Sequence, residues 1–113
     1  GGNRDRKKRP LMGKIASKYA DKATVTDDNP RYENPARIRE EVIGNLKNIS
    51  EIGNRKLAIK KAISELKRGD LLLIAGKGHE KFQSIMGKKF PFDDVKIAEK
   101  YLQKAVKLLP YNY

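Results

Sequence analysis

Three short polar segments carry residue types that could recognise a small charged ligand. They are Gly1–Asp5, Asp27–Arg31 and Gly76–Glu80, and together they offer arginines, carboxylates, an amide and the backbone N–H groups of glycines. A guanidinium group binds a carboxylate through paired hydrogen bonds, and a carboxylate accepts hydrogen bonds from an ammonium group. The combination favours a zwitterionic ligand that carries both groups. It suits a bare polyanion less well, because Asp28 and Glu80 would repel one.

Residues for catalysis or metal binding are scarce in the sequence. The chain has no cysteine and one histidine, His79, which excludes disulfides, thiolate ligands and a Cys nucleophile and disfavours a zinc site. No serine accompanies His79, so no Ser-His-Asp arrangement is indicated. No G-x-x-x-x-G-K-[ST] motif occurs either, so the chain lacks a nucleotide-binding P-loop of its own. We therefore assign no catalytic residue and no metal ligand.

Two of these polar segments, and the further motif Asp93-Asp94, also have a simpler structural interpretation. Asp28-Asn29-Pro30 is a common turn sequence, His79 alone is typical of a helix cap or a packing residue, and Asp93-Asp94 predicts an N-cap pair. Position favours the ligand interpretation, because ligands of open parallel sheets bind beyond the carboxyl ends of the strands. Asp27–Arg31 and Gly76–Glu80 each follow a predicted strand, so we expect them on one rim.

Apolar residues at helical spacing predict the helices that must hold these segments. The predicted helices are Leu11–Lys22, Pro35–Lys47 after an Asn34 N-cap, Asn54–Arg68, and a last helix from Asp93-Asp94 through Leu109. The first carries Met12, Ile15, Ala16 and Tyr19 at this spacing; the others are expected to pack through Ile38, Val42 and Leu46, through Ile59, Ala62, Ile63 and Leu66, and through Ala98, Tyr101, Leu102, Ala105 and Leu109.

The strands complete the predicted fold. Ala23–Thr26 is short and partly β-branched, and Asp70–Ala75 is apolar from its second residue onward, typical of a strand covered on both faces of a parallel sheet. Phe82–Met86 and Lys89–Phe92 predict a hairpin. The order predicts an α/β, Rossmann-like fold with a mostly parallel sheet, flanking helices and a C-terminal β-hairpin. Because a glycine-rich turn such as Gly1-Gly2 usually follows a strand, we expect either a fragment whose first strand is missing or a disordered N-terminus.

Length and charge limit the alternatives. The chain has 113 residues, enough for one domain, and 26 Lys and Arg against 14 Asp and Glu give a net charge of +12. Such a charge is compatible with a small basic nucleic-acid-binding module, which remains the alternative function at this point. No apolar run approaches the roughly 20 residues of a membrane span, and no signal peptide is evident, so we expect a cytoplasmic protein.

Four motifs in order resemble a known family. Gly1–Asp5 with Lys8–Gly13, then Asp27–Arg31, Ile74–Glu80 and Phe92–Asp94, are similar to the C-terminal domain of the Mur ligases, in the MurE branch. The resemblance covers essentially all 113 residues. It implies an ATP-dependent amide ligase of peptidoglycan synthesis, which adds meso-diaminopimelate to UDP-N-acetylmuramoyl-L-alanyl-D-glutamate.

The resemblance also implies a division of labour between domains. In that family a central domain binds ATP and magnesium and forms an acyl phosphate, and the C-terminal domain delivers the amino acid whose amine attacks it. Residues 1–113 correspond to the C-terminal domain, so the N-terminal and central domains are expected as partners outside this chain. We expect the 113 residues alone to be inactive.

The family's diaminopimelate-binding residues fall on seven positions of this chain. By the resemblance, Arg31 would bind the distal carboxylate that lysine lacks, Glu80 the ammonium on the same carbon, and Arg4 the other carboxylate. Lysine-adding members usually have another residue where Arg31 stands, and the family usually has Asp where this chain has Asn3. The full set is Arg4, Asp28, Asn29, Pro30, Arg31, Gly76 and Glu80.

Overall fold

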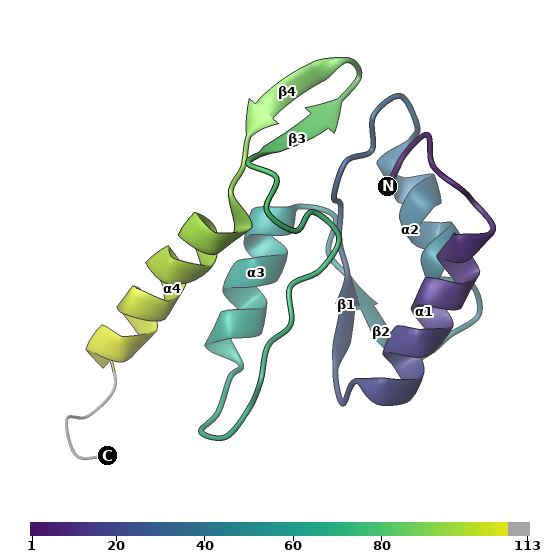
Figure 1. Cartoon of the computed structure of the whole chain (residues 1–113). Helices are drawn as coiled ribbons and strands as arrows, with labels where there is room; N and C mark the ends of the chain where they lie inside the picture. Colours follow the sequence, from purple (N-terminus) through teal and green to yellow (C-terminus); the bar gives the residue numbers. More distant parts are fainter. Residues whose placement is uncertain (109–113) are drawn as a thin grey trace.

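A computed structural model describes residues 1–108 of the chain, with side chains up to residue 104. Helices α1 and α2 pack against each other on one side of a small parallel sheet, and α3 packs against α4 on the other side (Figure 1). This arrangement confirms the predicted α/β class with a parallel sheet and a hairpin. The elements are α1 (Lys8–Tyr19), β1 (Ala23–Val25), α2 (Pro35–Ile43), β2 (Ile49–Glu51), α3 (Arg55–Ser64), β3 (Phe82–Ile85), β4 (Lys88–Pro91) and α4 (Asp94–Leu108).

The parallel sheet consists of β1 and β2. Ala23 pairs with Ile49 and Val25 with Glu51, and the pairing continues beyond the strands where Asp27 N donates to the Gly53 carbonyl at 3.3 Å. Strand β2 was not predicted, because three residues with a single apolar side chain give no periodic signal. The sheet directs the segment after β1 towards one end of the molecule.

The helix starts follow from local capping. Asn34 Oδ1 accepts from Ala36 N, Asn54 Oδ1 from Leu57 N, and Asp93 Oδ1 from Val95 N, at 2.9, 3.0 and 3.0 Å. The predicted cap at Asn34 is therefore confirmed, and so is that at Asp93. Helix α2 ends before Gly44, whose φ of +52° breaks the helical backbone, so the predicted end at Lys47 is too late.

The core lies mainly along α3. Ala58, Ile59 and Ile63 are buried, which confirms the predicted inner positions 59 and 63. The other predicted packing residues of α2 and α3, at 38, 42, 46, 62 and 66, are half-buried. On α4, Ala98 and Tyr101 are half-buried and Leu102 is exposed, whereas Leu109 and the side chain of Ala105 lie outside the described residues.

Helix α1 buries little of its predicted apolar face, of which only Ala16 is half-buried among the four residues named. Met12, Ile15 and Tyr19 are exposed, and the helix packs on α2 through Gly13 instead. A Cβ atom at Gly13 would lie 1.9 Å from the Val42 carbonyl oxygen, so the close approach of the two helices requires glycine at this position.

The predicted strand Asp70–Ala75 does not form among the described residues. Leu71 and Leu73 are 93% and 83% exposed, while Leu72 and Ile74 are half-buried. The exposure alternates with the period of a strand. Within residues 1–108, however, no strand pairs with this segment, so its backbone has no ladder to join and the prediction of two covered faces is wrong.

The predicted hairpin is confirmed with a small shift. Phe82 pairs with Pro91 and Ile85 with Lys88, and the turn is Met86-Gly87, whose φ angles are +51° and +78°. Two consecutive positive φ angles are the geometry that matches the twist of a two-residue hairpin. No helix within residues 1–108 combines the length and the hydrophobicity that crossing a membrane requires.

Candidate functional site

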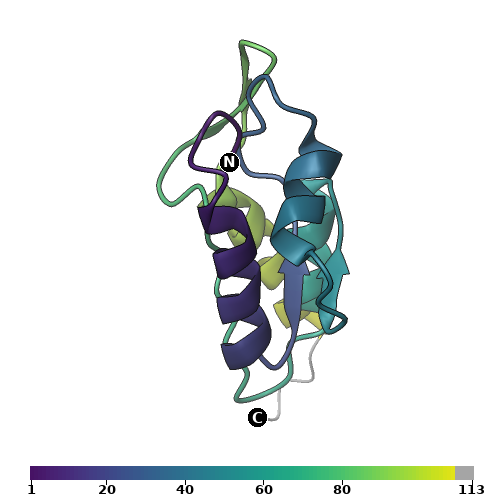
Figure 2. The same ribbon diagram turned by 90° about the vertical axis from the view of Figure 1, so that its right-hand side faces the viewer.

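The three predicted polar segments lie at one end of the molecule. The N-terminal loop, the loop between β1 and α2 and the loop before β3 meet there, with the β3–β4 hairpin beside them (Figures 1 and 2). Gly76 lies against Asp28: a Cβ atom on the glycine would be 3.3 Å from Asp28 Oδ2. The φ of Gly76 is +108°, which side-chain-bearing residues rarely adopt, so this backbone conformation favours glycine here.

Asn29 connects these segments through hydrogen bonds of its side chain and its backbone. Its side chain is buried, with Nδ2 donating to Glu80 Oε1 at 3.0 Å and Oδ1 accepting from Ser84 N at 2.8 Å. Its carbonyl accepts from Gly2 N at 2.7 Å. One asparagine thus holds the loop after β1 against the N-terminal loop, the Glu80 loop and strand β3.

Arg31 adopts a left-handed backbone conformation, with φ +55°. Its N–H donates to the Ser84 carbonyl at 2.8 Å, and its own carbonyl accepts from Met86 N at 2.6 Å. The side-chain Nη1 donates to the carbonyls of Gly2 and Asn29 at 2.7 and 3.3 Å. Nε and Nη2 have no hydrogen-bond partner among the described residues, so one edge of the guanidinium is available to a ligand.

The N-terminal loop is fixed from two sides. Gly2 is buried, and a Cβ atom there would lie 1.7 Å from the Pro30 carbonyl oxygen. On the other side, the buried Arg9 donates to the Gly1 carbonyl at 2.9 Å and to the carboxylates of Glu33 and Glu41 at 2.7 and 2.5 Å. Pro30 is buried and shapes this contact through its backbone.

Arg4 is the one predicted binding residue that the structure does not bring into the group. Its side chain is exposed and makes no hydrogen bond or ion pair with the described residues. The preceding Asn3 has φ +55° and its side chain accepts from Tyr32 N at 3.2 Å, which ties this part of the N-terminal loop to the loop before α2. An asparagine tolerates this conformation well.

Two residues that support the site were not assigned a role from the sequence. Lys77 is 2% exposed, and its Nζ donates to the carbonyls of Glu80 and Phe82 at 2.9 and 2.7 Å, which closes the Gly76–Glu80 loop. Gln83 Nε2 donates to the Asp28 carbonyl at 2.8 Å. Lys77 lies within the polar segment Gly76–Glu80, whereas nothing in the residue pattern of strand β3 indicates a role for Gln83.

Beside the site, two carboxylates are held in the charged form by arginines. Hydrogen bonds from Arg6 and then Arg9 lower the pKa of Glu41 to about 2. The hydrogen bond from Arg9 is also the main cause of the lowered pKa of Glu33. The cluster of Arg6, Arg9, Glu33 and Glu41 therefore stays ionised at neutral pH and ties α1 to α2.

The prediction that Asp93 and Asp94 form an N-cap pair is wrong for Asp94. Asp93 caps α4, but its neighbour is 6% exposed and is not part of an N-cap pair. Its carboxylate instead accepts from Nε and Nη2 of Arg55, at 2.8 and 2.6 Å. Neither member of this buried ion pair has a sequence signature beyond following a cap residue.

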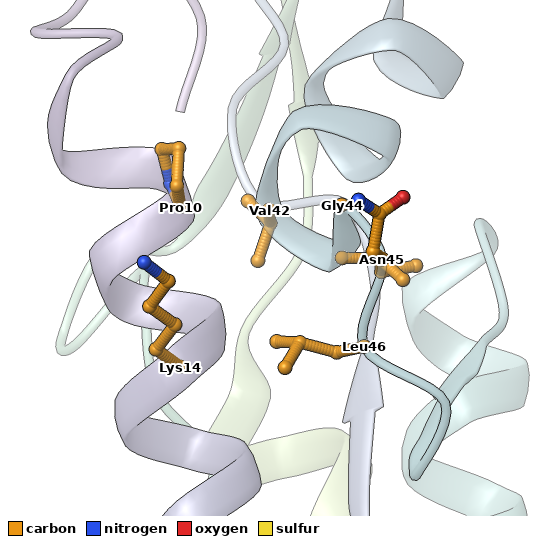
Figure 3. A pocket seen from close by; sticks show the side chains of 7 residues that line it. Pro10, Lys14, Val42, Gly44, Asn45 and Leu46 are labelled. Atoms are coloured by element: carbon orange, nitrogen blue, oxygen red, sulfur yellow. The ribbon is translucent and has the colours of Figure 1, made fainter.

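A separate hollow lies between α1 and the end of α2. It measures about 230 Å³ and is lined by Pro10 and Lys14 on one side and Val42, Gly44 and Leu46 on the other (Figure 3). None of the predicted binding residues lines it. The hollow is largely apolar and offers no arrangement for a zwitterionic ligand.

The arrangement at the rim can bind both signs of charge at fixed positions. Arg31 presents a free guanidinium edge, and Oε2 of Glu80 has no hydrogen-bond partner among the described residues. The described residues contain no cluster of three His, Asp or Glu side chains placed to hold a metal ion. A free guanidinium edge can pair with a carboxylate, and a free carboxylate oxygen can accept a hydrogen bond from an ammonium group.

Comparisons with known proteins agree with the motifs. The family model described as "Mur ligase, glutamate ligase domain" matches residues 1–78. A relative from Rickettsia felis, the UDP-N-acetylmuramoyl-L-alanyl-D-glutamate–2,6-diaminopimelate ligase, is 52% identical over 112 residues, which are 97% of this chain and 21% of the relative. The ligase of the same name from Aquifex aeolicus is 48% identical over 105 residues, covering 90% of this chain and 22% of that protein.

A solved structure gives the same result. The structure of a UDP-N-acetylmuramoyl-L-alanyl-D-glutamate–2,6-diaminopimelate ligase matches with a TM-score of 0.87 and 38% identity, over 94% of this chain and 23% of that one. The chain thus spans about a fifth of the length of the curated relatives it matches. The matches give no support to the nucleic-acid-binding alternative. Fold, motif order and relatives agree, and the chain belongs to the Mur ligase family, within whose glutamate ligase domain its residues 1–78 fall.

Proposed function

We propose that this chain is the amino-acid-binding domain of an ATP-dependent ligase that adds meso-diaminopimelate to UDP-N-acetylmuramoyl-L-alanyl-D-glutamate. The relatives that carry this domain are named for that reaction. Its product would enter peptidoglycan synthesis, on which cell shape and division depend. Because the reaction uses ATP and a UDP-linked substrate, we place it in the cytoplasm.

The observation that carries the proposal is the free edge of Arg31. Nη1 is held by the Gly2 and Asn29 carbonyls, which fixes the plane of the guanidinium while Nε and Nη2 remain available. A planar fork of this kind matches a carboxylate with two hydrogen bonds. Diaminopimelate differs from lysine by one terminal carboxylate, so a fixed arginine fork would distinguish the two amino acids.

The remaining predicted residues supply the complementary charges. Glu80 would accept from the ammonium group on the same distal carbon, with Asn29 fixing the orientation of its carboxylate. Asp28, Pro30 and Gly76 would shape the wall beside it. Arg4 would bind the other carboxylate after its exposed side chain turns towards the ligand. These residues would place the attacking amine near the activated carboxyl, and orientation alone is worth about 7 kcal/mol or more of a bimolecular barrier.

We propose that ATP and magnesium are bound mainly by a central domain of the complete ligase, which would be a partner of this domain together with an N-terminal domain. The sequence has no P-loop motif, and the described residues offer no cluster of metal-binding side chains. The short share of the relatives that this chain covers supports such an arrangement.

The exposed side of residues 70–75 supports the same arrangement. Leu71 and Leu73 are exposed, whereas the alternate residues Leu72 and Ile74 are half-buried. Within residues 1–108, β1 pairs only with β2, so its other edge has no partner strand. A further strand of the complete ligase, laid parallel to β1, would pair both backbones and place its own side chains beside those leucines. The domain would then have the continuous parallel sheet that the sequence predicts.

The test is an amide-forming assay with the complete ligase, ATP, magnesium and the UDP-linked dipeptide. We expect meso-diaminopimelate to be used in strong preference to lysine, as measured by formation of the extended nucleotide. Equal use of both amino acids would contradict the proposal. The 113-residue chain under the same conditions is expected to give no product, and product from it would overturn the division between domains.

A further inference from the structure

The side chain of Arg55 joins four parts of the chain that are distant in sequence. Nε and Nη2 donate to the two carboxylate oxygens of Asp94 at 2.8 and 2.6 Å. Nη1 donates to the Asp27 carbonyl at 3.2 Å, and Nη2 also donates to the Ala75 carbonyl at 3.0 Å. Arg55 is 3% exposed and Asp94 6% exposed, so water does not compete for these bonds.

The two backbone acceptors are adjacent to predicted ligand residues. Asp27 directly precedes Asp28, and Ala75 directly precedes Gly76. The starts of α3 and α4, which carry Arg55 and Asp94, lie together at the end of the molecule where the loops meet (Figure 1). One guanidinium therefore sets the separation of the two loops at the point where Gly76 contacts Asp28.

Stability alone does not explain the choice of these residues. A buried ion pair gives little net stability compared with apolar residues of similar size, because both charges lose their hydration. Arg55 is also the first residue of α3, where the helix dipole disfavours a positive charge. What a fixed arginine offers instead is geometry, since its planar fork binds a carboxylate and two carbonyls in set directions.

We propose that Arg55 and Asp94 form a positioning pair for the amino-acid site: Asp94 orients the guanidinium, and Arg55 holds the loops that carry Asp28 and Gly76 at the spacing that the ligand needs. The pair does not touch the ligand. This inference rests on the proposed function for its kinetic consequence, but the geometric part stands on the contacts alone.

The experiment compares Arg55→Lys, Asp94→Asn and Ile63→Ala in the complete ligase. Lysine keeps the charge but cannot reach the carboxylate and both carbonyls at once, and asparagine keeps the shape but weakens the pairing. Ile63 is buried on the same helix α3 and makes no contact with either loop through hydrogen bonds, so its variant is a control for lost stability. Thermal unfolding midpoints, kcat, and KM for meso-diaminopimelate and for ATP are measured for each.

We expect Arg55→Lys to raise KM for meso-diaminopimelate about tenfold or more with KM for ATP unchanged, since displacements of about 1 Å at a site have effects of this size or larger. Asp94→Asn is expected to have a smaller effect in the same direction. Ile63→Ala is expected to lower the unfolding midpoint with both KM values unchanged. If all three variants lose stability and none changes KM for the amino acid, the pair is structural and the inference is wrong.

Hydrogen exchange separates this outcome from a failure of the proposed function. In Arg55→Lys, amide exchange is expected to accelerate in residues 26–31 and 75–80 relative to β2, whatever the ligand is. If the unmutated ligase does not use diaminopimelate but the loops still loosen, the proposed function fails and the positioning role stands. If exchange in both loops is unchanged in Arg55→Lys, the positioning role is overturned.

Discussion

Asn29 and Glu80, which are 51 residues apart in the sequence, are joined by a hydrogen bond of 3.0 Å from the side-chain amide to the carboxylate. This bond fixes the orientation of the Glu80 carboxylate, whose Oε2 has no hydrogen-bond partner among the described residues. Because Asn29 also accepts from Ser84 N, the same residue ties Glu80 to the hairpin.

Replacing Asn29 by Asp tests this role with almost no change of shape. The new carboxylate still accepts from Ser84 N but faces Glu80 with like charge and no donor. A buried group that loses its partner costs about 1–3 kcal/mol, so we expect a loss of that size in the free energy of unfolding. Denaturant unfolding measures the loss. If Asn29→Asp has the same free energy of unfolding as the unmutated protein from pH 5 to 8, the role of the Asn29–Glu80 hydrogen bond is contradicted.

Arg31→Lys is expected to remove most of the preference for meso-diaminopimelate over lysine. Lysine keeps the positive charge but cannot reproduce the two-pronged contact. Removing one partner of a desolvated charge pair outright costs roughly 2–5 kcal/mol; because lysine keeps the charge, we expect a part of that loss, a fall of about tenfold in the ratio of kcat/KM values. Arg37→Ala, which removes an exposed arginine of α2, is the matched control and should leave the ratio as it is.

Gly2→Ala is expected to separate the N-terminal loop from the loop after β1. The added methyl would lie 1.7 Å from the Pro30 carbonyl oxygen, so the backbones must move apart and the Gly2–Asn29 hydrogen bond is lost. Forced overpacking of this kind costs about 1–3 kcal/mol. Denaturant unfolding measures the loss, and a free energy of unfolding equal to that of the unmutated protein would show that the contact carries no weight.

The acid sensitivity of the protein should depend on Glu41. Arg6 and Arg9 lower its pKa to about 2, from an ordinary value of 4.5. A lowered pKa in the folded state means that the carboxylate stabilises the fold above its ordinary pKa and that this contribution is lost as the pH falls towards 2. We expect Glu41→Gln to be less stable than the unmutated protein near neutral pH, with the difference shrinking below about pH 4. A difference that stays constant over this range would contradict the ion pairs as its source.

The sequence predicts the local parts of this fold well and the long-range parts less well. The Asn34 and Asp93 caps and the hairpin of β3 and β4 depend on neighbouring residues, so their chemistry is visible in the chain. The turn itself lies at Met86-Gly87, one residue before the predicted Gly87-Lys88. Whether residues 49–51 and 70–75 form strands depends on which backbone lies beside them. The pattern of residues along the chain does not contain that information. The apolar spacing on α1 indicates a buried face, but the helix packs through Gly13 instead.

In the candidate site, too, the sequence predicts some residues and not others. Motif order and strand ends place Asp28, Asn29, Arg31, Gly76 and Glu80 at one rim, and the structure brings them together. The buried charges that hold the rim were not predicted. An arginine such as Arg55 is compatible with any exposed helix start until its partner, 39 residues away, is known.

The uncovered leucines of residues 70–75 have a consequence for laboratory work on the isolated chain. Leu71 and Leu73 lie on the surface beside backbone groups that no strand of residues 1–108 occupies. Such an edge invites pairing with another copy of itself. Solutions of the 113 residues alone should therefore associate as their concentration rises, and light scattering on this preparation would reveal it before any ligand is added.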